Sequence, residues 1–208
     1  MIVVKTYNEP QFCEKEILRY ASCRDEDRDV LELIRSCIDE VRQKLSYKVC
    51  YSEFDMPVKT ESKMLLKNLE GCSTVIVFAA TIGVEIDRLI SRYGRISPSR
   101  ALIMQAIGTE RIEALCDEFC KSLENERNIT LSPRFSPGYG DLPIECQKDI
   151  FNILDCSRKI GVTLSDSFLM SPSKSVTAFV GIRNTKTKKI ENKCSLCEKT
   201  DCSFRGGK

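Results

Sequence analysis

The sequence has 208 residues, of which 42% are hydrophobic and 30% are charged, which is typical of one soluble globular domain or of one domain followed by a tail. It contains no histidine, which excludes Ser-His-Asp and Cys-His catalytic arrangements and histidine-ligated metal sites. No stretch approaches the roughly 20 apolar residues that a membrane-spanning helix requires, and a net charge of +2 indicates neither a nucleic-acid nor a membrane partner.

The charge is distributed unevenly along the chain. Residues 183–208 contain eight lysines and arginines against three acidic residues, a net charge of +5. The totals of 32 basic and 30 acidic residues therefore leave 24 and 27 in residues 1–182, a net charge of −3. We expect a mildly acidic domain over 1–182 and a basic, cysteine-rich tail over 183–208.

The N-terminus and the cysteines indicate the compartment. Residues 1–5 lack the charged start and apolar run of a signal peptide, so we expect a cytoplasmic protein. In the cytosol the twelve cysteines would be reduced thiols or metal ligands rather than disulfides. Cys37, Cys116 and Cys120 lie on apolar faces of expected helices, where a small buried hydrophobic side chain is the expected role.

Hydrophobic spacing predicts secondary structure in the first half of the chain. Apolar residues at helical spacing predict helices, and alternating or continuous apolar runs predict strands. In chain order we expect helices over 10–21 and 27–45, a strand over 47–54, a helix over 60–69, a buried central strand over 73–80 and a helix that begins near residue 84.

The second half is expected to contain two helices and two strands. A serine-proline pair at 97–98 is typical of a helix start, and this helix should end near residue 125. A second helix is expected from Pro143 to Gly161, with Asp141 and Glu145 near its N-terminal end, where the helix dipole favours carboxylates. A short strand over 162–164 and an antiparallel strand over 175–182 complete the pattern, which has no regular βαβ period and predicts an α+β fold.

The segment 134–140, Arg-Phe-Ser-Pro-Gly-Tyr-Gly, connects two of the expected helices. Pro137 fixes φ and Gly138 permits a positive φ, so the backbone should turn sharply and can approach a ligand closely. Arg134 adds a planar fork of N–H donors, and Tyr139 adds an aromatic face with a hydroxyl. Such a loop can hold a carboxylate together with a flat heterocycle. By themselves, however, these residues favour the alternative of an ordinary Pro-Gly turn beside a surface arginine.

Further motifs follow the loop. After the expected helix and Gly161 come the stretch 166–172, Asp-Ser-Phe-Leu-Met-Ser-Pro, and then Ser175 and Val176. In this order and spacing the chain resembles the reductive-activation domain of vitamin B12-dependent methionine synthase, whose motifs are R-x-x-P-G-Y, a helix, a glycine turn and E/D-S-F-x-M-x-P-x-x-S-V. The resemblance is specific over 134–176, is weaker upstream and does not cover the tail after residue 182.

The resemblance implies a twisted, mainly antiparallel sheet flanked by helices. In the family this domain binds S-adenosylmethionine and presents it to cobalamin, so that cobalt oxidised to Co(II) can be reduced and remethylated. By resemblance, Arg134 would hold the methionine carboxylate, and the turn over 137–139 would line the adenosyl pocket. The other residues that match the family's ligand-binding motifs are Ser136, Pro137, Gly138, Tyr139 and Ser175.

Glu113 lies at the edge of the apolar stripe of the helix expected after residue 97, one turn beyond Thr109. A carboxylate at such a boundary can reach a pocket rim without being buried unpaired, and it can equally be a solvated flank residue. The resemblance favours the first interpretation. The family has an acidic ligand for S-adenosylmethionine on the matching helix, in an A-E-A-like context that Glu113 and Ala114 reproduce.

The resemblance implies a stand-alone reactivation module rather than a complete methionine synthase. It would act in trans on a cobalamin-binding methionine synthase or related corrinoid protein, with a reductant such as flavodoxin or ferredoxin, and need not itself be an enzyme. Because methyl transfer from a sulfonium to Co(I) is a displacement by a very strong nucleophile, orientation is the expected contribution of the protein. A conventional small-substrate methyltransferase and a metal-binding or Fe–S redox accessory protein remain alternatives.

Three cysteines lie close together in the tail. Cys194 and Cys197 have the C-x-x-C spacing that lets two thiolates bind one metal, and Cys202 follows them. Three ligands are one short of a closed Cys₄ zinc or iron–sulfur site, so another cysteine, a second chain or an exogenous ligand would have to complete it. We expect a cluster or zinc at these residues, with reactive or regulatory thiols and an inert tail as the alternatives.

Overall fold

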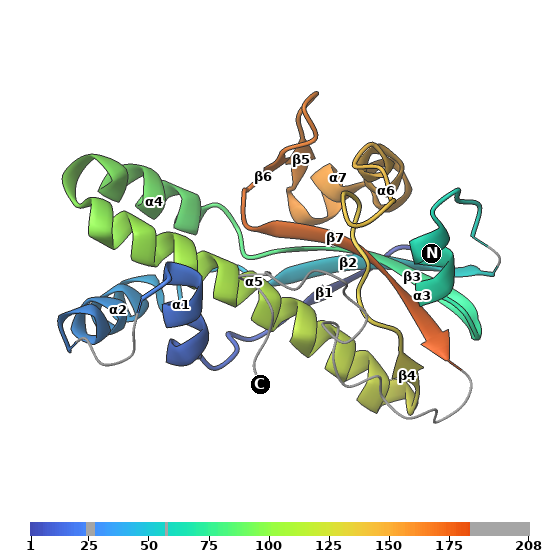
Figure 1. Ribbon diagram of the computed structural model, residues 1–208, viewed down its shortest axis with the longest axis horizontal. Coiled ribbons are helices and arrows are strands. Elements are labelled where there is room, and N and C mark those ends of the chain that lie inside the picture. Colours follow the sequence, from blue (N-terminus) through green and yellow to red (C-terminus); the bar gives the residue numbers. More distant parts are fainter. Residues whose placement is uncertain (24–27, 57, 184–208) are drawn as a thin grey trace.

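The computed structural model describes residues 1–23, 28–56 and 58–183. At its centre lies an antiparallel five-stranded sheet with the strand order β1-β2-β3-β7-β4 (Figure 1). Helices cover both of its faces, which confirms the expected α+β fold. The strands of the sheet are β1 (Val3–Thr6), β2 (Lys48–Asp55), β3 (Cys72–Thr81), β7 (Ser175–Arg183) and β4 (Thr130–Leu131).

Strand β3 occupies the middle of the sheet, as the continuous apolar run over 73–80 predicts. Phe78 lies opposite Tyr51 of β2 on one side and Ala178 of β7 on the other. From Val75 to Ala80 no residue is more than 3% exposed. A strand with both faces covered by helices cannot alternate between apolar and polar residues, and this explains the unbroken apolar run.

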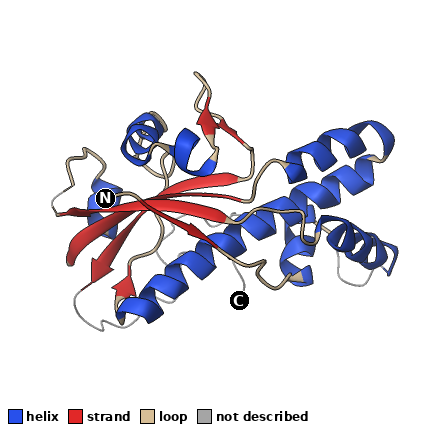
Figure 2. Cartoon of the chain, turned by 180° about the vertical axis from the view of Figure 1, so that it is seen from behind, coloured by secondary structure: helices blue, strands red, loops and turns tan. Residues whose placement is uncertain are grey.

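The larger helical layer covers one face of the sheet (Figure 2). Its helices are α1 (Glu14–Ala21), α2 (Arg28–Val41), α4 (Glu85–Ile96) and α5 (Pro98–Arg127). The ring of Phe119 on α5 lies 4.8 Å from that of Phe78 and 5.3 Å from that of Tyr51, measured between centroids. Helix α5 begins at Pro98 as expected, although the Ser97 side chain makes no capping hydrogen bond.

The smaller layer lies on the opposite face and corrects one prediction. It contains α3 (Lys63–Asn68), α6 (Cys146–Leu154) and α7 (Cys156–Ile160). A single helix from Pro143 to Gly161 was the wrong expectation, because Asp155 adopts a left-handed φ of 49° and separates α6 from α7. The break turns the chain so that both Ile150 and Cys156 pack on the same apolar cluster beneath the sheet.

The strands expected over 47–54, 162–164 and 175–182 are present. The second of them, β5 (Thr163–Leu164), pairs with β6 (Met170–Ser171) in a separate two-stranded sheet. In β7, Ala178, Val180 and Ile182 are buried in the main core, and the partly buried Val176 packs against it. Strands β1, β4 and β6 were not predicted, since elements of two to four residues carry little periodicity.

The helix expected over 10–21 begins only at Glu14, since the residues before it bind to α5 instead of to one another. The main-chain carbonyls of Pro10 and Gln11 accept hydrogen bonds from the Arg111 guanidinium, at 2.8 Å for Gln11. These carbonyl oxygens are therefore held by a side chain, and the backbone around them is not helical.

Arg111 is completely buried, and its charge is balanced within the core. Its guanidinium pairs with Glu110 and lies 3.9 Å over the ring of Phe12. The Glu110 carboxylate also accepts a hydrogen bond from the amide of Cys13 at 3.2 Å. This pair therefore fixes the segment before α1 on α5 and places α1 beside the middle of that helix.

We expect Glu110→Leu to leave the Arg111 charge buried without its carboxylate. The free energy of unfolding should fall by roughly 3–5 kcal/mol, the usual loss when one partner of a buried ion pair is removed. Urea denaturation followed by circular dichroism measures this change. Glu118→Leu, on the exposed side of the same helix, is the matched control and should change the free energy by less than about 0.5 kcal/mol. Equal losses in the two variants would contradict the role of the pair.

Candidate functional site

The segment that carries Arg134 runs along the outer edge of β7. The main-chain amide of Ser132 donates to the carbonyl of Gly181 at 2.8 Å, and the Ser132 hydroxyl accepts from the Gly181 amide at 2.8 Å. Phe135 and Phe179 exchange two further main-chain hydrogen bonds, of 2.9 and 2.8 Å. These bonds place Arg134 at the level of Val180, with its side chain on the α5 side of the sheet.

Beyond Phe135 the chain turns sharply, as the Pro-Gly pair predicts. The amide of Tyr139 donates to the carbonyl of Ser136 at 3.1 Å, and that of Gly138 donates to the carbonyl of Leu142 at 2.9 Å. Gly138 has a φ of 84°, which non-glycine residues rarely adopt. The ring of Tyr139 is 71% exposed, although its edge contacts the Phe135 ring at a centroid distance of 6.3 Å.

Asp141 has a different role from the one expected of it. Its carboxylate does not serve the helix that follows it but caps α3, accepting hydrogen bonds from the Lys63 amide at 2.8 Å, the Met64 amide at 3.3 Å and the Ser62 hydroxyl. These donors, led by the Ser62 hydroxyl, hold the pKa of Asp141 below its ordinary value. The cap therefore attaches the far end of the loop to α3, and both ends of the loop are anchored.

The structure brings Arg134 and Glu113 together. One terminal nitrogen of Arg134 lies 2.6 Å from a carboxylate oxygen of Glu113, and the other is paired with Asp117. The Arg134 side chain is only 11% exposed, whereas those of Glu113 and Asp117 are 44% and 75% exposed. The guanidinium thus lies beneath two carboxylates that reach solvent at the surface of α5.

The surroundings of Arg134 keep it charged. Burial by itself lowers the pKa of the guanidinium, but the charges of Asp117 and Glu113 outweigh burial and help to raise it above its ordinary value. Burial also raises the pKa values of the Cys116 and Cys120 thiols, which remain neutral hydrophobic groups as their helical spacing indicated. One guanidinium against two carboxylates gives this cluster a net charge of −1.

Ser175 takes no part in the Arg134 cluster. It is buried at the start of β7, where its hydroxyl bonds to Thr81 at 2.9 Å and to the main-chain carbonyl of Pro172 at 2.8 Å. It lies four residues before Phe179, which is roughly 13 Å along a strand. In this structure Ser175 orders the turn before β7.

Sequence reasoning missed Asp117. The signal was present, since Thr109, Glu113 and Asp117 follow one another at intervals of four residues and therefore share one side of α5. Only the position of Arg134 shows that this side carries a site. We refer to these three α5 residues below as the α5 strip.

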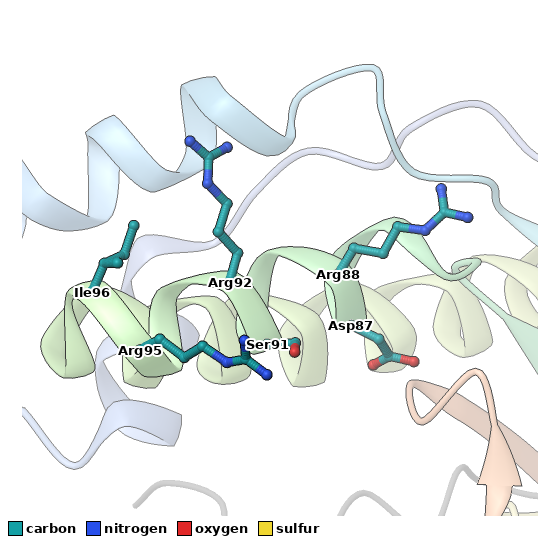
Figure 3. A pocket seen from close by; sticks show the side chains of 6 residues that line it. All are labelled: Asp87, Arg88, Ser91, Arg92, Arg95 and Ile96. Atoms are coloured by element: carbon teal, nitrogen blue, oxygen red, sulfur yellow. The ribbon is translucent and has the colours of Figure 1, made fainter.

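A different surface carries an open hollow of about 700 Å³, lined by side chains of α4 alone (Figure 3). None of the residues predicted for the site lines it. Asp87 accepts hydrogen bonds from the amide and the hydroxyl of Ser173, at 2.8 and 2.5 Å, and Arg88 is paired with Glu85. A hollow whose walls come from one helix is an exposed helix surface and lacks the convergent groups of a small-molecule site. The lining residues are Asp87, Arg88, Ser91, Arg92, Arg95 and Ile96.

The described residues contain neither a cluster of metal ligands nor a helix that could span a membrane. Within 1–23, 28–56 and 58–183, no three His, Cys, Asp or Glu side chains gather in a way that could hold a metal ion. In the same ranges no helix combines the length and the apolar composition needed to cross a membrane. The predicted metal ligands Cys194, Cys197 and Cys202 lie outside the described residues.

Known proteins share both sequence and fold with this chain. The family model "Vitamin B12 dependent methionine synthase, activation domain" matches residues 14–191. The fold is similar to that in a crystal structure of the MetH reactivation domain bound to AdoHcy, with a TM-score of 0.67 and 16% sequence identity over 90% of this chain and 80% of that chain. No curated protein matches the sequence. The family match covers Glu113, Asp117 and the whole Arg134 loop.

We expect Asp141→Asn to lower the free energy of unfolding at pH 7, because the amide is a weaker partner for the α3 amides than the carboxylate. The pKa of Asp141 is lower in the folded than in the unfolded protein, so its contribution is complete above the unfolded pKa and is lost as the pH falls through the folded one. The difference from wild type should therefore shrink as the pH falls below 3.8, the ordinary pKa of the group. Urea denaturation at pH 7 and at a series of acidic pH values measures it.

The matched control for this experiment is Asp149→Asn, which changes an exposed carboxylate on α6. Its free energy of unfolding should differ from that of wild type by the same amount at every pH in this range. If the difference in the free energy of unfolding between Asp141→Asn and wild type were also independent of pH, the ionised carboxylate would not contribute to stability.

Proposed function

The chain belongs to the family of activation domains of vitamin B12-dependent methionine synthase, and we propose that it binds S-adenosylmethionine at the Arg134 loop and supports the reductive remethylation of cobalamin on a separate protein. The observation that carries this proposal is the cluster of Arg134, Glu113 and Asp117 at the surface of α5. The AdoHcy bound to the MetH reactivation domain supports a ligand of the same chemical class.

The charge of the cluster matches the charge of the proposed ligand. S-adenosylmethionine carries a carboxylate, an ammonium and a sulfonium, and therefore has a net charge of +1. The cluster has a net charge of −1 and contains groups of both signs close together. A zwitterionic amino-acid end needs this combination, because its ammonium and carboxylate lie on the same carbon.

Each charged end of the amino acid has a partner in the cluster. The two ion pairs use two of the five N–H donors of Arg134 and Cys120 takes another, so the remaining donors are assigned to the ligand carboxylate. Glu113 and Asp117 are the acceptors for the ligand ammonium. Both carboxylates are partly exposed, so a ligand can reach them from solvent.

The adenosyl part of the ligand is assigned to the turn that follows Arg134. Ser136 and Pro137 begin the turn after the loop leaves β7, and Gly138 brings main-chain atoms into that turn without a side chain. The exposed ring of Tyr139 offers an aromatic face to a flat heterocycle or to the sulfonium. Ser175 is assigned an indirect role, through the order of the turn before β7.

The contribution of the chain to methyl transfer is the orientation of the methyl donor. Cobalamin on the partner protein supplies the nucleophilic cobalt that accepts the methyl group. A displacement of this kind needs no acid–base group from the chain, which is compatible with a sequence without histidine. We therefore assign no catalytic residue.

The partners follow from this assignment. The chain would dock in trans on a cobalamin-binding methionine synthase or a related corrinoid protein in the cytoplasm, with flavodoxin or ferredoxin as the electron donor. Neither a nucleic acid nor a membrane is required. Residues 1–182 would form the ligand-binding domain and 183–208 the basic tail.

The tail cysteines support a second candidate role, in electron supply. Cys194, Cys197 and Cys202 are three thiols within nine residues of a polar segment, which core packing does not explain. Returning Co(II) to Co(I) needs a low-potential electron, and iron–sulfur clusters reach potentials as low as roughly −700 mV. We propose a cluster or zinc at these residues, completed by a ligand from elsewhere.

We expect Arg134→Ala to abolish detectable S-adenosylmethionine binding without unfolding the protein. Loss of a charged hydrogen-bond partner should weaken binding by roughly 30- to 1,000-fold. Glu113→Gln should weaken binding less, because the amide still accepts a hydrogen bond. Isothermal titration calorimetry measures each affinity.

Cys116→Ser is the control for this series, since the thiol is buried and touches no proposed ligand atom. It should lower stability and leave the affinity unchanged. Wild-type affinity in Arg134→Ala would remove Arg134 from the site. The function itself is tested by adding the protein, S-adenosylmethionine and a reductant to a Co(II) corrinoid protein and measuring methylation of the corrinoid.

The tail makes a separate prediction. Protein prepared without oxygen should contain iron or zinc in a fixed ratio to the chain, measured by elemental analysis. The double variant Cys194→Ala/Cys197→Ala should lose the metal and keep S-adenosylmethionine binding. Metal-free protein with full reactivating activity would leave the tail as a basic arm for the acidic surface of a partner.

A further inference from the structure

Lys174 is a half-buried cation that forms no close ion pair with the described residues. Its ammonium donates to the Thr109 hydroxyl at 3.0 Å, and among the described residues no carboxylate oxygen lies within 4.0 Å of it. The nearby Asp87 carboxylate is occupied by Ser173. Burial lowers the pKa of Lys174. An ammonium has three N–H donors and no acceptor, so two of these donors lack a described protein partner.

Gly108 makes room for the Lys174 side chain. A Cβ at this position would lie 2.9 Å from the Cε atom of Lys174 and 3.0 Å from its Cγ atom, closer than real Cβ contacts. Glycine inside a helix costs about 1 kcal/mol relative to alanine, and Gly108 lies in the interior of α5. Helix α5 is therefore less stable with glycine than with alanine at position 108, where the aliphatic part of the Lys174 side chain crosses it.

The ammonium of Lys174 reaches the same surface as the Arg134 cluster. Thr109, which it contacts, precedes Glu113 by one helical turn on the α5 strip. Lys174 comes directly before β7, and Arg134 lies at the level of Val180 farther along that strand. Beyond Phe135 the chain leaves the edge of β7 and turns towards α3, which Asp141 caps.

The edge of β7 between these two cations also has unpaired main-chain groups. The N–H and C=O of Phe179 face outward to Phe135, and those of Thr177, two residues earlier, face the same way because strand residues alternate. In the described part of the chain the main-chain groups of Thr177 have no hydrogen-bond partner on this edge. This end of the strand edge thus presents two free N–H groups of Lys174 together with an unpaired N–H and an unpaired C=O of Thr177.

We propose that Lys174, positioned over Gly108 and together with Thr109, binds the nucleoside part of the ligand. This inference rests on the proposed function, in which Arg134 binds the amino-acid part. A nucleoside brings ribose hydroxyls and ring nitrogens, which are the neutral acceptors that the two free N–H groups of Lys174 require. The Thr109 hydroxyl already donates to the carbonyl of Gln105 at 3.0 Å, so towards a ligand it acts as an acceptor.

The test compares two ligands in calorimetry: S-adenosylmethionine and 5′-methylthioadenosine, which keeps the nucleoside and lacks the amino-acid end. Lys174→Met should weaken the binding of both ligands by the same factor, roughly 10- to 100-fold for a charged hydrogen bond. Arg134→Ala should weaken only the binding of S-adenosylmethionine. Thr109→Val should weaken both ligands by a smaller common factor, and it keeps the test valid if Lys174→Met unfolds.

Lys159→Met removes an exposed lysine on α7 and is the matched control, with unchanged affinities for both ligands. If Lys174→Met weakens S-adenosylmethionine but not 5′-methylthioadenosine, Lys174 belongs to the amino-acid end and the inference is wrong. Wild-type affinities in Lys174→Met, or wild-type protein that binds S-adenosylmethionine but not 5′-methylthioadenosine, would also overturn it. Wild-type protein that binds neither ligand would instead contradict the proposed function.

Discussion

The pairing of residues 132–135 with the outer edge of β7 is the constraint on which the candidate site depends. The hydrogen bonds of Ser132 with Gly181 and of Phe135 with Phe179 fix the register of the loop, and the register decides on which face each side chain lies. A shift of one residue would move Arg134 from the α5 side to the α6 side of the sheet. Strand β7 is itself paired with the central strand β3, so the loop is fixed to the core of the sheet.

The ion pairs between Arg134 and the carboxylates of α5 depend on that register. Arg134 is largely buried, and a buried guanidinium needs acceptors close by; Glu113 and Asp117 supply them from successive turns of one helix. The pairs are only partly shielded from water, so their contribution to stability is small compared with that of the buried Glu110 and Arg111 pair. Their importance lies in holding groups of both signs at one place on the surface.

The two cations of the proposed ligand site, Arg134 and Lys174, are held in place by different contacts. At the Arg134 end, the carboxylates of α5 and the edge of β7 fix the cation. At the other end, Lys174 crosses α5 over Gly108, where a Cβ would force the lysine side chain to shift. The turn over 136–139 is attached to α3 through Asp141. A methyl donor needs this kind of fixed frame, since its orientation is what the protein contributes to the transfer.

The sequence determined the larger elements and the family. Long helices, the apolar strand β3 and the alternating strand β7 follow from periodicity, and the R-x-x-P-G-Y and D-S-F-x-M-x-P-x-x-S-V motifs led to the family that the match over 14–191 shows. The tertiary structure decided what depends on contacts between distant residues: the late start of α1 at Glu14, the break at Asp155, the cap that Asp141 provides for α3, and the meeting of Arg134 and Lys174 with the α5 strip. Local periodicity could not predict these features, because each arises from an ion pair, a hydrogen bond or a close approach between segments that are far apart in the chain.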